Sequence, residues 1–124
     1  MIATSTYLLL YVDSPATSAN FYSRLLDRPP VALSPAFTLF VLDSGLKLGL
    51  WARHDVEPAA QVTGGGGELA LAVADTQAVD LLHGQWAESG VSIAQPPTSL
   101  DFGYTFVVLD PDGHRLRVFC PAPE

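Results

Sequence analysis

The sequence predicts an α+β domain made of two tandem modules, each a strand, a helix and then about three strands. Three observations predict it: a repeated alternating strand that ends in a helix start signal, a repeated Gly-containing hairpin, and a Pro- and Gly-rich stretch between the copies. We place the modules at about residues 5–53 and 68–121 of a single domain, 1–124, with a linker over 54–67.

Both copies open in the same way. "YLLLYVDS" at 7–14 matches "ELALAVAD" at 68–75, and both alternate as half-buried strands do. Ser14, with Pro15 after it, and Asp75 are the predicted helix N-caps, and Gly90 is the predicted stop of the second helix. The predicted buried stripes of the two helices are Phe21, Tyr22 and Leu25, and Val79, Leu82 and Trp86.

Both copies also close in the same way. "FTLFVLDSGLKLGLW" at 37–51 matches "YTFVVLDPDGHRLRVF" at 104–119, because each reads aromatic-Thr, an apolar run, Val-Leu-Asp, a turn and another strand. This match places Phe37 beside Trp51 and Tyr104 beside Phe119 in two hairpins. A weaker strand is expected near 31–33 and again near 91–94.

Alternation along the strands separates two faces, since successive side chains point to opposite sides of a sheet. The apolar face is predicted to hold Leu8, Leu10, Val12, Phe40, Leu42, Leu46, Leu48, Leu50, Leu69, Leu71, Val73, Val107, Leu109, Leu116 and Val118. The mixed face is predicted to hold Tyr7, Leu9, Tyr11, Phe37, Leu39, Val41, Lys47, Gly49, Trp51, Glu68, Ala70, Ala72, Tyr104, Phe106, Arg115, Arg117 and Phe119. Aromatic, small and charged residues in one surface are typical of a ligand cavity.

Composition excludes several classes of function. A net charge of −7 argues against nucleic acid and against anionic membrane surfaces. The N-terminal residues show neither a signal peptide nor a membrane span. The single cysteine, Cys120, allows no intrachain disulfide, which favours the cytoplasm, and is expected to be inert.

The duplicated unit, opened by "VDSPATSANFYSRLL" and closed by "DPDGHRLRV", resembles the vicinal oxygen chelate superfamily of glyoxalases, ring-cleaving dioxygenases and bleomycin-resistance proteins. The resemblance implies curved mixed sheets around a cavity, usually in a dimer, and we expect a homodimer with two equivalent cavities. Enzymes of this family hold a divalent metal at positions that correspond here to Tyr7, Gly49, Glu68 and Arg117.

That set predicts a protein without a metal or other cofactor. Tyrosine is a poor ligand for a catalytic divalent ion, glycine has no side chain, and arginine repels a cation, so only Glu68 can coordinate. We interpret the Asp110–Gly113 stretch as a β-turn rather than a calcium site, because further ligands are missing.

Metal-free members of this family with aromatic-lined cavities resemble drug-sequestering proteins, and "FVLDSGLKLGLW" looks most like the phenazine-resistance kind. We therefore expect a binder of a planar aromatic antibiotic, phenazine- or bleomycin-like, with no catalytic residue. Trp51 would stack on the ligand, Gly49 would leave room for it, and Arg117 would bind a ligand carboxylate. The predicted ligand-binding residues are Tyr7, Phe37, Leu39, Gly49, Trp51, Glu68, Asp101, Phe102, Tyr104, Phe106 and Arg117.

Several alternatives stay open from the sequence. Trp51, Phe37 and Tyr104 can pack a closed core, Glu68 and Arg117 can form a structural ion pair, and residues 95–104 can be a plain connection. The chain can also be a lyase, isomerase or dioxygenase-like enzyme, with a metal or with Glu68 as a general base. A small sensor or scaffold with a vestigial cavity is the third class.

Overall fold

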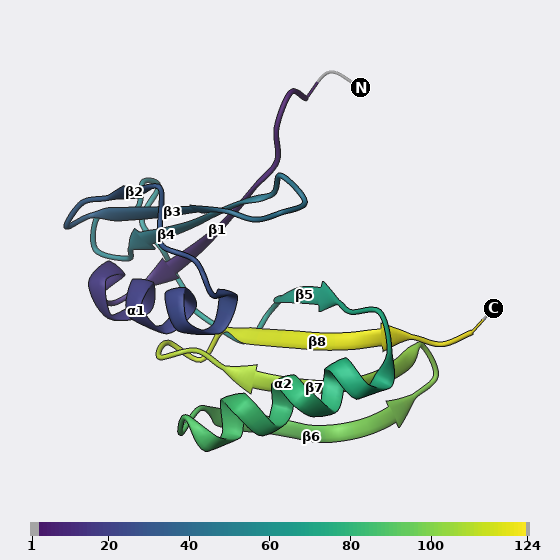
Figure 1. The fold of residues 1–124 in the computed structure, drawn as a ribbon. Coiled ribbons are helices and arrows are strands. Elements are labelled where there is room, and N and C mark those ends of the chain that lie inside the picture. The colour runs from purple at the N-terminus through teal and green to yellow at the C-terminus, as the bar shows by residue number, and fades with distance from the viewer. Residues whose placement is uncertain (1–2, 124) are drawn as a thin grey trace. The chain divides into compact units, whose positions relative to one another are not determined.

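In the computed structural model, which describes residues 3–123, the chain divides between Gly64 and Gly65 into two compact units. The first contains β1 (Tyr7–Val12), α1 (Pro15–Leu26), β2 (Ala32–Leu33), β3 (Phe37–Val41) and β4 (Lys47–Ala52), drawn from purple to teal in Figure 1. The second contains β5 (Glu68–Ala72), α2 (Thr76–Glu88), β6 (Ser92–Leu100), β7 (Gly103–Leu109) and β8 (Arg115–Pro121).

The two units share one topology. Their four-stranded sheets have the orders β1-β4-β3-β2 and β5-β8-β7-β6, which are the same order counted along each unit. In both sheets the first strand pairs parallel with the last, and the other pairs are antiparallel. The predicted α+β fold of two βαβββ modules is therefore confirmed.

The helix signals in the sequence are confirmed. The Ser14 hydroxyl accepts a hydrogen bond from the backbone N–H of Thr17 at 3.2 Å, and Pro15 follows as the first helical residue. The Asp75 carboxylate accepts from the N–H of Ala78 at 2.8 Å. Gly90, with φ +88°, stands just beyond the end of α2.

In each unit the helix packs on one face of the sheet, which makes the core. All three stripe residues of α1 are buried, and Val79 and Trp86 of α2 are buried while Leu82 is half-buried. The fully buried apolar residues of the sheets beneath include Val12, Phe40, Leu48, Leu50, Phe106, Val108, Leu116 and Val118. Burial of this apolar surface is the main stabilising contribution to each unit.

The face assignment is correct in the first unit and wrong for β7 in the second. Phe37 pairs with Trp51 as predicted, whereas Tyr104 pairs with Cys120 and not with Phe119. A slip of one residue transfers every side chain of a strand to the other face. Val107 pairs with Arg117, and paired residues in a ladder share a face.

Contacts with α2 confirm this correction. The Tyr104 hydroxyl donates to the Asp80 carboxylate at 2.7 Å. The ring centroid of Phe106 lies 5.4 Å from those of both His83 and Trp86. Tyr104 and Phe106 therefore lie on the helix-covered face of their sheet. On β7 the mixed face instead carries Thr105, Val107 and Leu109.

Strand β6 is longer than predicted. The sequence reads as a strand near 91–94 and then as connection, but the strand runs on to Leu100 and pairs with β7 to its end. The register shifts between Ile93 and Gln95 and again between Gln95 and Thr98, around Pro96 and Pro97. Proline has no N–H to give to a ladder, and β6 is an edge strand, where such interruptions are tolerated.

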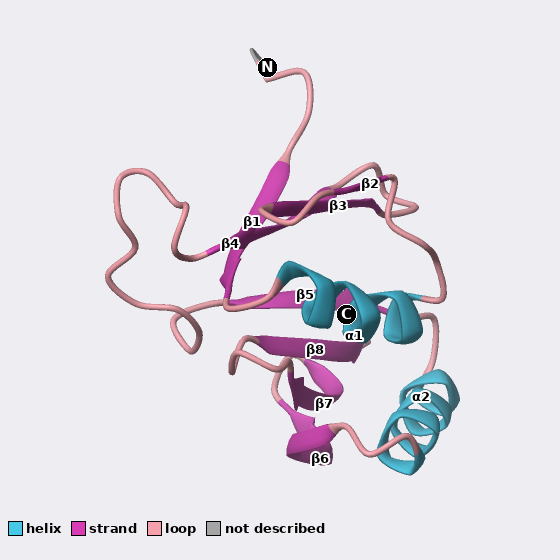
Figure 2. Ribbon diagram, turned by 90° about the vertical axis from the view of Figure 1, so that its left-hand side faces the viewer, coloured by secondary structure: helices cyan, strands magenta, loops and turns pink. Residues whose placement is uncertain are grey.

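The connection from β4 to β5 contains neither helix nor strand over residues 53–67, and it is the long loop in Figure 2. The boundary between the units falls inside its glycine run, 64–67. Neither α1 nor α2, the helices of the described residues, is long and apolar enough to cross a membrane.

Candidate functional site

On the mixed face of the first unit, side chains form three rows across β1, β4 and β3. One row is Tyr11, Trp51 and Phe37, the next is Leu9, Gly49 and Leu39, and the third is Tyr7, Lys47 and Val41. The ring centroids of Tyr11 and Trp51 are 6.3 Å apart, edge to face. Three aromatic residues on adjacent strands thus share one row, which we call the aromatic row.

The space above Gly49 is filled by neighbouring side chains. A methyl group added at this position would lie 2.6 Å from the tip of the Phe37 ring and 2.7 Å from a methyl carbon of Leu9. Because Gly49 has no side chain, the Phe37 ring can lie against the sheet at this position. The sequence predicts open space for a ligand here, and the structure fills that space with Phe37.

The second unit repeats these rows with other residues. The row that corresponds to the aromatic one is Ala72, Phe119 and Thr105, and the next is Ala70, Arg117 and Val107, continued by Gln95 on β6. The third row is Glu68, Arg115 and Leu109. The mixed face thus carries mainly aromatic and apolar side chains in the first unit, and its charged side chains are concentrated in the second.

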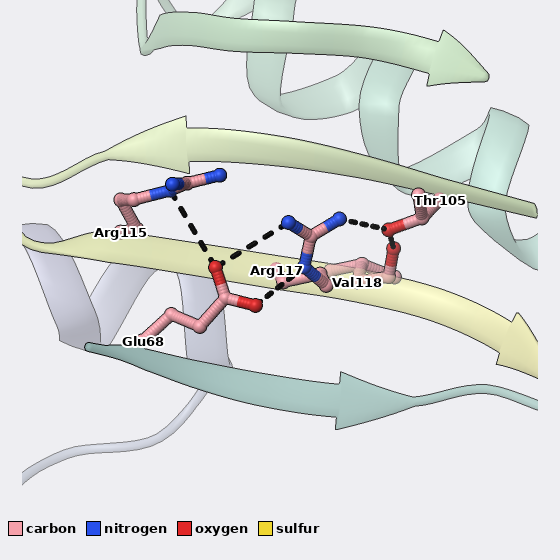
Figure 3. Close-up of polar contacts among 5 residues, drawn as sticks. All are labelled: Glu68, Thr105, Arg115, Arg117 and Val118. Carbon is pink, nitrogen blue, oxygen red and sulfur yellow. Dashed lines mark hydrogen bonds and ion pairs between the residues drawn. The ribbon is translucent and has the colours of Figure 1, made fainter. Parts of the chain in front are cut away.

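The charged cluster centres on the Glu68 carboxylate (Figure 3). Arg117 binds it with two nitrogen atoms, Nε to Oε1 at 2.6 Å and Nη2 to Oε2 at 3.4 Å. The remaining nitrogen of Arg117, Nη1, donates to the Thr105 hydroxyl at 3.2 Å, and that hydroxyl donates to the Val118 carbonyl at 2.8 Å. The bidentate geometry fixes the plane of the guanidinium group.

Arg115 approaches the same carboxylate less closely. Its Nε lies 3.5 Å from Glu68 Oε2, an ion pair without a hydrogen bond among the described residues. The side chain of Arg115 is 42% exposed, whereas that of Arg117 is 12% exposed. The two arginines that share this face therefore have different environments.

Two aromatic rings border the cluster. Phe102, just after β6, lies edge to face with Phe119 at 5.9 Å between ring centroids, and the Arg117 guanidinium carbon is 5.4 Å from the centroid of Phe102. Phe102 is 45% exposed. A cation near an aromatic ring in this way is a stabilising contact that leaves the ring accessible.

The predicted binding residues thus fall into two groups, one in each unit, with two exceptions. Tyr7, Phe37, Leu39, Gly49 and Trp51 share the mixed face of the first unit. Glu68, Phe102 and Arg117 lie together in the second, and Asp101 is exposed in the turn beside Phe102. Tyr104 and Phe106 belong to the other face of β7, where Tyr104 and Cys120 line a cavity of about 560 Å³ beside the N-terminus of α2.

Sequence reasoning missed Thr105, Val107 and Leu109 on the mixed face. The position of the turn glycine is the sequence signal that predicts their register correctly. When Gly45 is aligned with Gly113, both hairpin loops have equal length and the register of the second follows from the first. The turn itself is as predicted, since the N–H of Gly113, with φ +82°, donates to the Asp110 carbonyl at 3.0 Å.

The positions expected to hold a divalent metal do not fit one. The Lys47 ammonium lies 5.2 Å from the centroid of the Tyr7 ring, Gly49 has no donor, and both oxygens of Glu68 are engaged by arginine. Across residues 3–123, no group of three or more His, Cys, Asp or Glu side chains is arranged to hold a metal.

Comparison with known proteins agrees with this architecture. Residues 4–118 match the family model of the Glyoxalase/Bleomycin resistance protein/Dioxygenase superfamily. The chain belongs to this superfamily. It is 30% identical over 122 residues to the phenazine antibiotic resistance protein EhpR of Enterobacter agglomerans, covering 95% of this chain and 92% of EhpR.

Two solved structures share the fold. The solution structure of protein ATC0852 from Agrobacterium tumefaciens has a TM-score of 0.87 and 53% sequence identity, covering 98% of this chain and all of that one. A glyoxalase-related enzyme from Fulvimarina pelagi has a TM-score of 0.83 at 22% identity, covering 96% and 88% of the two chains. At that identity the second likeness concerns the fold alone.

Proposed function

We propose that this protein binds a planar aromatic antibiotic of the phenazine type and sequesters it without chemical modification. The observation that carries the proposal is the aromatic row of Tyr11, Trp51 and Phe37 on a sheet face that no helix of its unit covers. The resemblance to EhpR, a phenazine antibiotic resistance protein, supports the choice of a phenazine and the proposed role in antibiotic resistance.

Binding would rest on stacking and burial. A flat ring system laid on this row gains apolar burial over three side chains and about 1 kcal/mol for each well-oriented ring pair. Trp51 is at the centre of the row, with Tyr11 on one side and Phe37 on the other. Residues of the central strand of a contact surface are the ones expected to carry most of its energy.

Binding without chemistry is supported by the residues that are present. The superfamily positions for a metal hold Tyr7, Gly49 and Arg117 beside a single acid, Glu68, whose oxygens are occupied. A residue set of this kind supplies no Lewis acid and no free base to a bound ring. The proposed binding residues are those of the mixed faces, without Tyr104 and Phe106.

The working unit in this proposal is a cytoplasmic homodimer with two equivalent cavities. Each sheet has four strands and open edges, and large side chains of the mixed faces are exposed, namely Tyr7, Leu9 and Phe102. Pairing of two copies about a two-fold axis is the common way to cover such surfaces.

The test is the affinity of Trp51→Ala for phenazine. Loss of the central ring should weaken binding by about 2 kcal/mol, roughly thirtyfold in Kd, measured by calorimetry. The matched control is Trp86→Phe, since Trp86 lies on the buried side of α2 and its substitution should leave Kd within about twofold of the parent. Mass spectrometry of the released ligand should recover it unchanged. Equal binding by parent and Trp51→Ala would contradict the assignment of the aromatic row.

A further inference from the structure

Lys47 is a half-buried cation that has no carboxylate partner in the part of the chain that the structure describes. The chain has only six Lys and Arg residues, and four of them lie within 3.8 Å of a carboxylate oxygen, namely Arg28, Arg53, Arg115 and Arg117. Of the other two, Arg24 is exposed on α1, whereas Lys47 is half-buried at the start of β4. Removing an ammonium group from water is unfavourable unless another charge compensates for it.

The ammonium group of Lys47 contacts an aromatic ring instead. Its Nζ lies 5.2 Å from the centroid of the Tyr7 ring, in the same row of the mixed face. Both residues keep solvent-accessible surface, and Tyr7 is 52% exposed. A cation–π contact attracts the ammonium group but does not neutralise its charge. The positive charge of Lys47 is therefore available to a ligand.

Lys47 also lines a cavity of about 560 Å³ in the first unit, at the turn between β3 and β4. The rest of its lining is formed by four hydroxyl residues and two residues of the turn, namely Thr4, Ser5, Thr6, Ser44, Gly45 and Leu46. No Asp or Glu is among these lining residues. In Figure 1 the segment that leads into β1 runs beside this turn, and the N–H of Lys47 donates to the Thr6 carbonyl at 3.0 Å. This backbone hydrogen bond holds the two walls of the cavity together.

The hydroxyl groups of this cavity are able to donate hydrogen bonds to a ligand. Those of Thr4, Ser5 and Thr6 donate to no other residue within 3–123. The Ser44 hydroxyl accepts a hydrogen bond from the N–H of Leu46 at 3.3 Å, which leaves its own proton to donate. An anion with several oxygen atoms can accept from several donors at once, and its bonds to a charged donor are the stronger ones. The lining is therefore made of donors around one positive charge.

We infer that this cavity binds an oxyanion group, a carboxylate or a phosphate, with Lys47 as the charged donor and the hydroxyls around it as neutral donors. The chain as a whole carries a net charge of −7, so binding of an anion here depends on these local contacts and not on the field of the whole protein. Lys47 and Trp51 are four residues apart on β4, about 13 Å along the strand. The oxyanion site is thus separate from the aromatic row and does not rest on the proposed function.

The experiment titrates the isotope-labelled full chain with inorganic phosphate, benzoate and benzamide at constant ionic strength, and follows the backbone amide signals by NMR. Both anions should shift the amides of residues 44–47 along a saturable curve, and benzamide, the neutral match of benzoate, should not. Lys47→Gln should weaken anion binding about tenfold, as loss of one charge-assisted hydrogen bond implies, while Lys47→Arg should keep most of the affinity. Ser44→Ala, in the exposed turn, should weaken it about threefold. The control is Arg24→Gln, which removes the exposed cation of α1 and should leave both affinities unchanged.

The order of the two affinities identifies the source of the oxyanion. Tighter binding of benzoate assigns it to an aromatic acid whose ring lies beside Tyr7, and tighter binding of phosphate assigns it to a free phosphate, so either order supports the site. Shifts that do not saturate, or that Lys47→Gln and Arg24→Gln reduce equally, would show general screening of charge and overturn the inference. Equal binding of benzamide and benzoate would overturn it as well, because the contact would then be with the ring and not with the oxyanion. None of these results bears on the affinity of Trp51→Ala for phenazine, which tests the proposed function separately.

Discussion

Phe106 offers a direct test of the strand register, because the register decides whether this ring is core or ligand surface. Its side chain is fully buried, between His83 and Trp86 of α2. A phenylalanine side chain buries about 150–250 Å², which at about 25 cal/mol per Å² corresponds to roughly 4–6 kcal/mol. Unfolded chains already bury part of this area, so the value is an upper bound.

We therefore expect Phe106→Ala to lower the free energy of unfolding by about 4 kcal/mol, within the usual range for such truncations. The matched control is Phe102→Ala, the same substitution on the opposite face of the same sheet. Phe102 is 45% exposed and contacts Phe119 and Arg117, so its removal should cost only about 1 kcal/mol. Urea unfolding followed by circular dichroism and tryptophan fluorescence measures both values.

Affinity for the ligand, unlike stability, should not depend on the side chain at position 106. Phe106→Leu, which keeps the apolar core, should bind phenazine as the parent does, because residue 106 faces the helix. Near-parent stability of Phe106→Ala, together with a loss of ligand affinity in Phe106→Leu, would contradict the register of β7. That result would mean that Phe106 faces the ligand and that β7 pairs with β8 one residue away from the register seen.

Two further predictions concern pH and assembly. The hydrogen bond that Tyr104 donates to Asp80 raises the pKa of Tyr104 above its usual 10.0, so its contribution to stability is present below pH 10 and is lost as the pH rises through the folded-state pKa. Titration of tyrosinate absorbance should show a late ionisation step that Tyr104→Phe removes. Sedimentation equilibrium at micromolar concentration should give about twice the chain mass of 13.2 kDa, and a ligand-binding monomer would exclude the proposed dimer.

The elements that depend on local signals could be predicted from the sequence. Ser14 and Asp75 cap the helices because their side chains reach an N–H three residues ahead, which needs no distant partner. The first hairpin was also predictable, since alternation and the Gly45 turn agree on one register, with Phe37 beside Trp51. The mismatch of Tyr7, Gly49 and Arg117 with a metal follows from residue chemistry alone.

The predicted register of the second hairpin was wrong because the two hairpins were aligned at the wrong residues. Matching Tyr104 with Phe37 shifts the hairpin by one position, and alternation has no way to correct this because Phe106 and Val107 are both apolar. Either residue suits a buried face. Only packing against α2 decides, since His83 and Trp86 leave a site that an aromatic ring fills.

The sequence thus largely determined which residues lie on the mixed faces. The tertiary structure decided what each of them contacts. Alternation places Arg115 and Arg117 on one face but treats them as equals. The difference between them arises because Glu68, 49 residues away in the chain, reaches Arg117 with two hydrogen bonds and Arg115 with none. Hydrogen bonds depend on distance and direction across strands, and those quantities exist only once the sheet has formed.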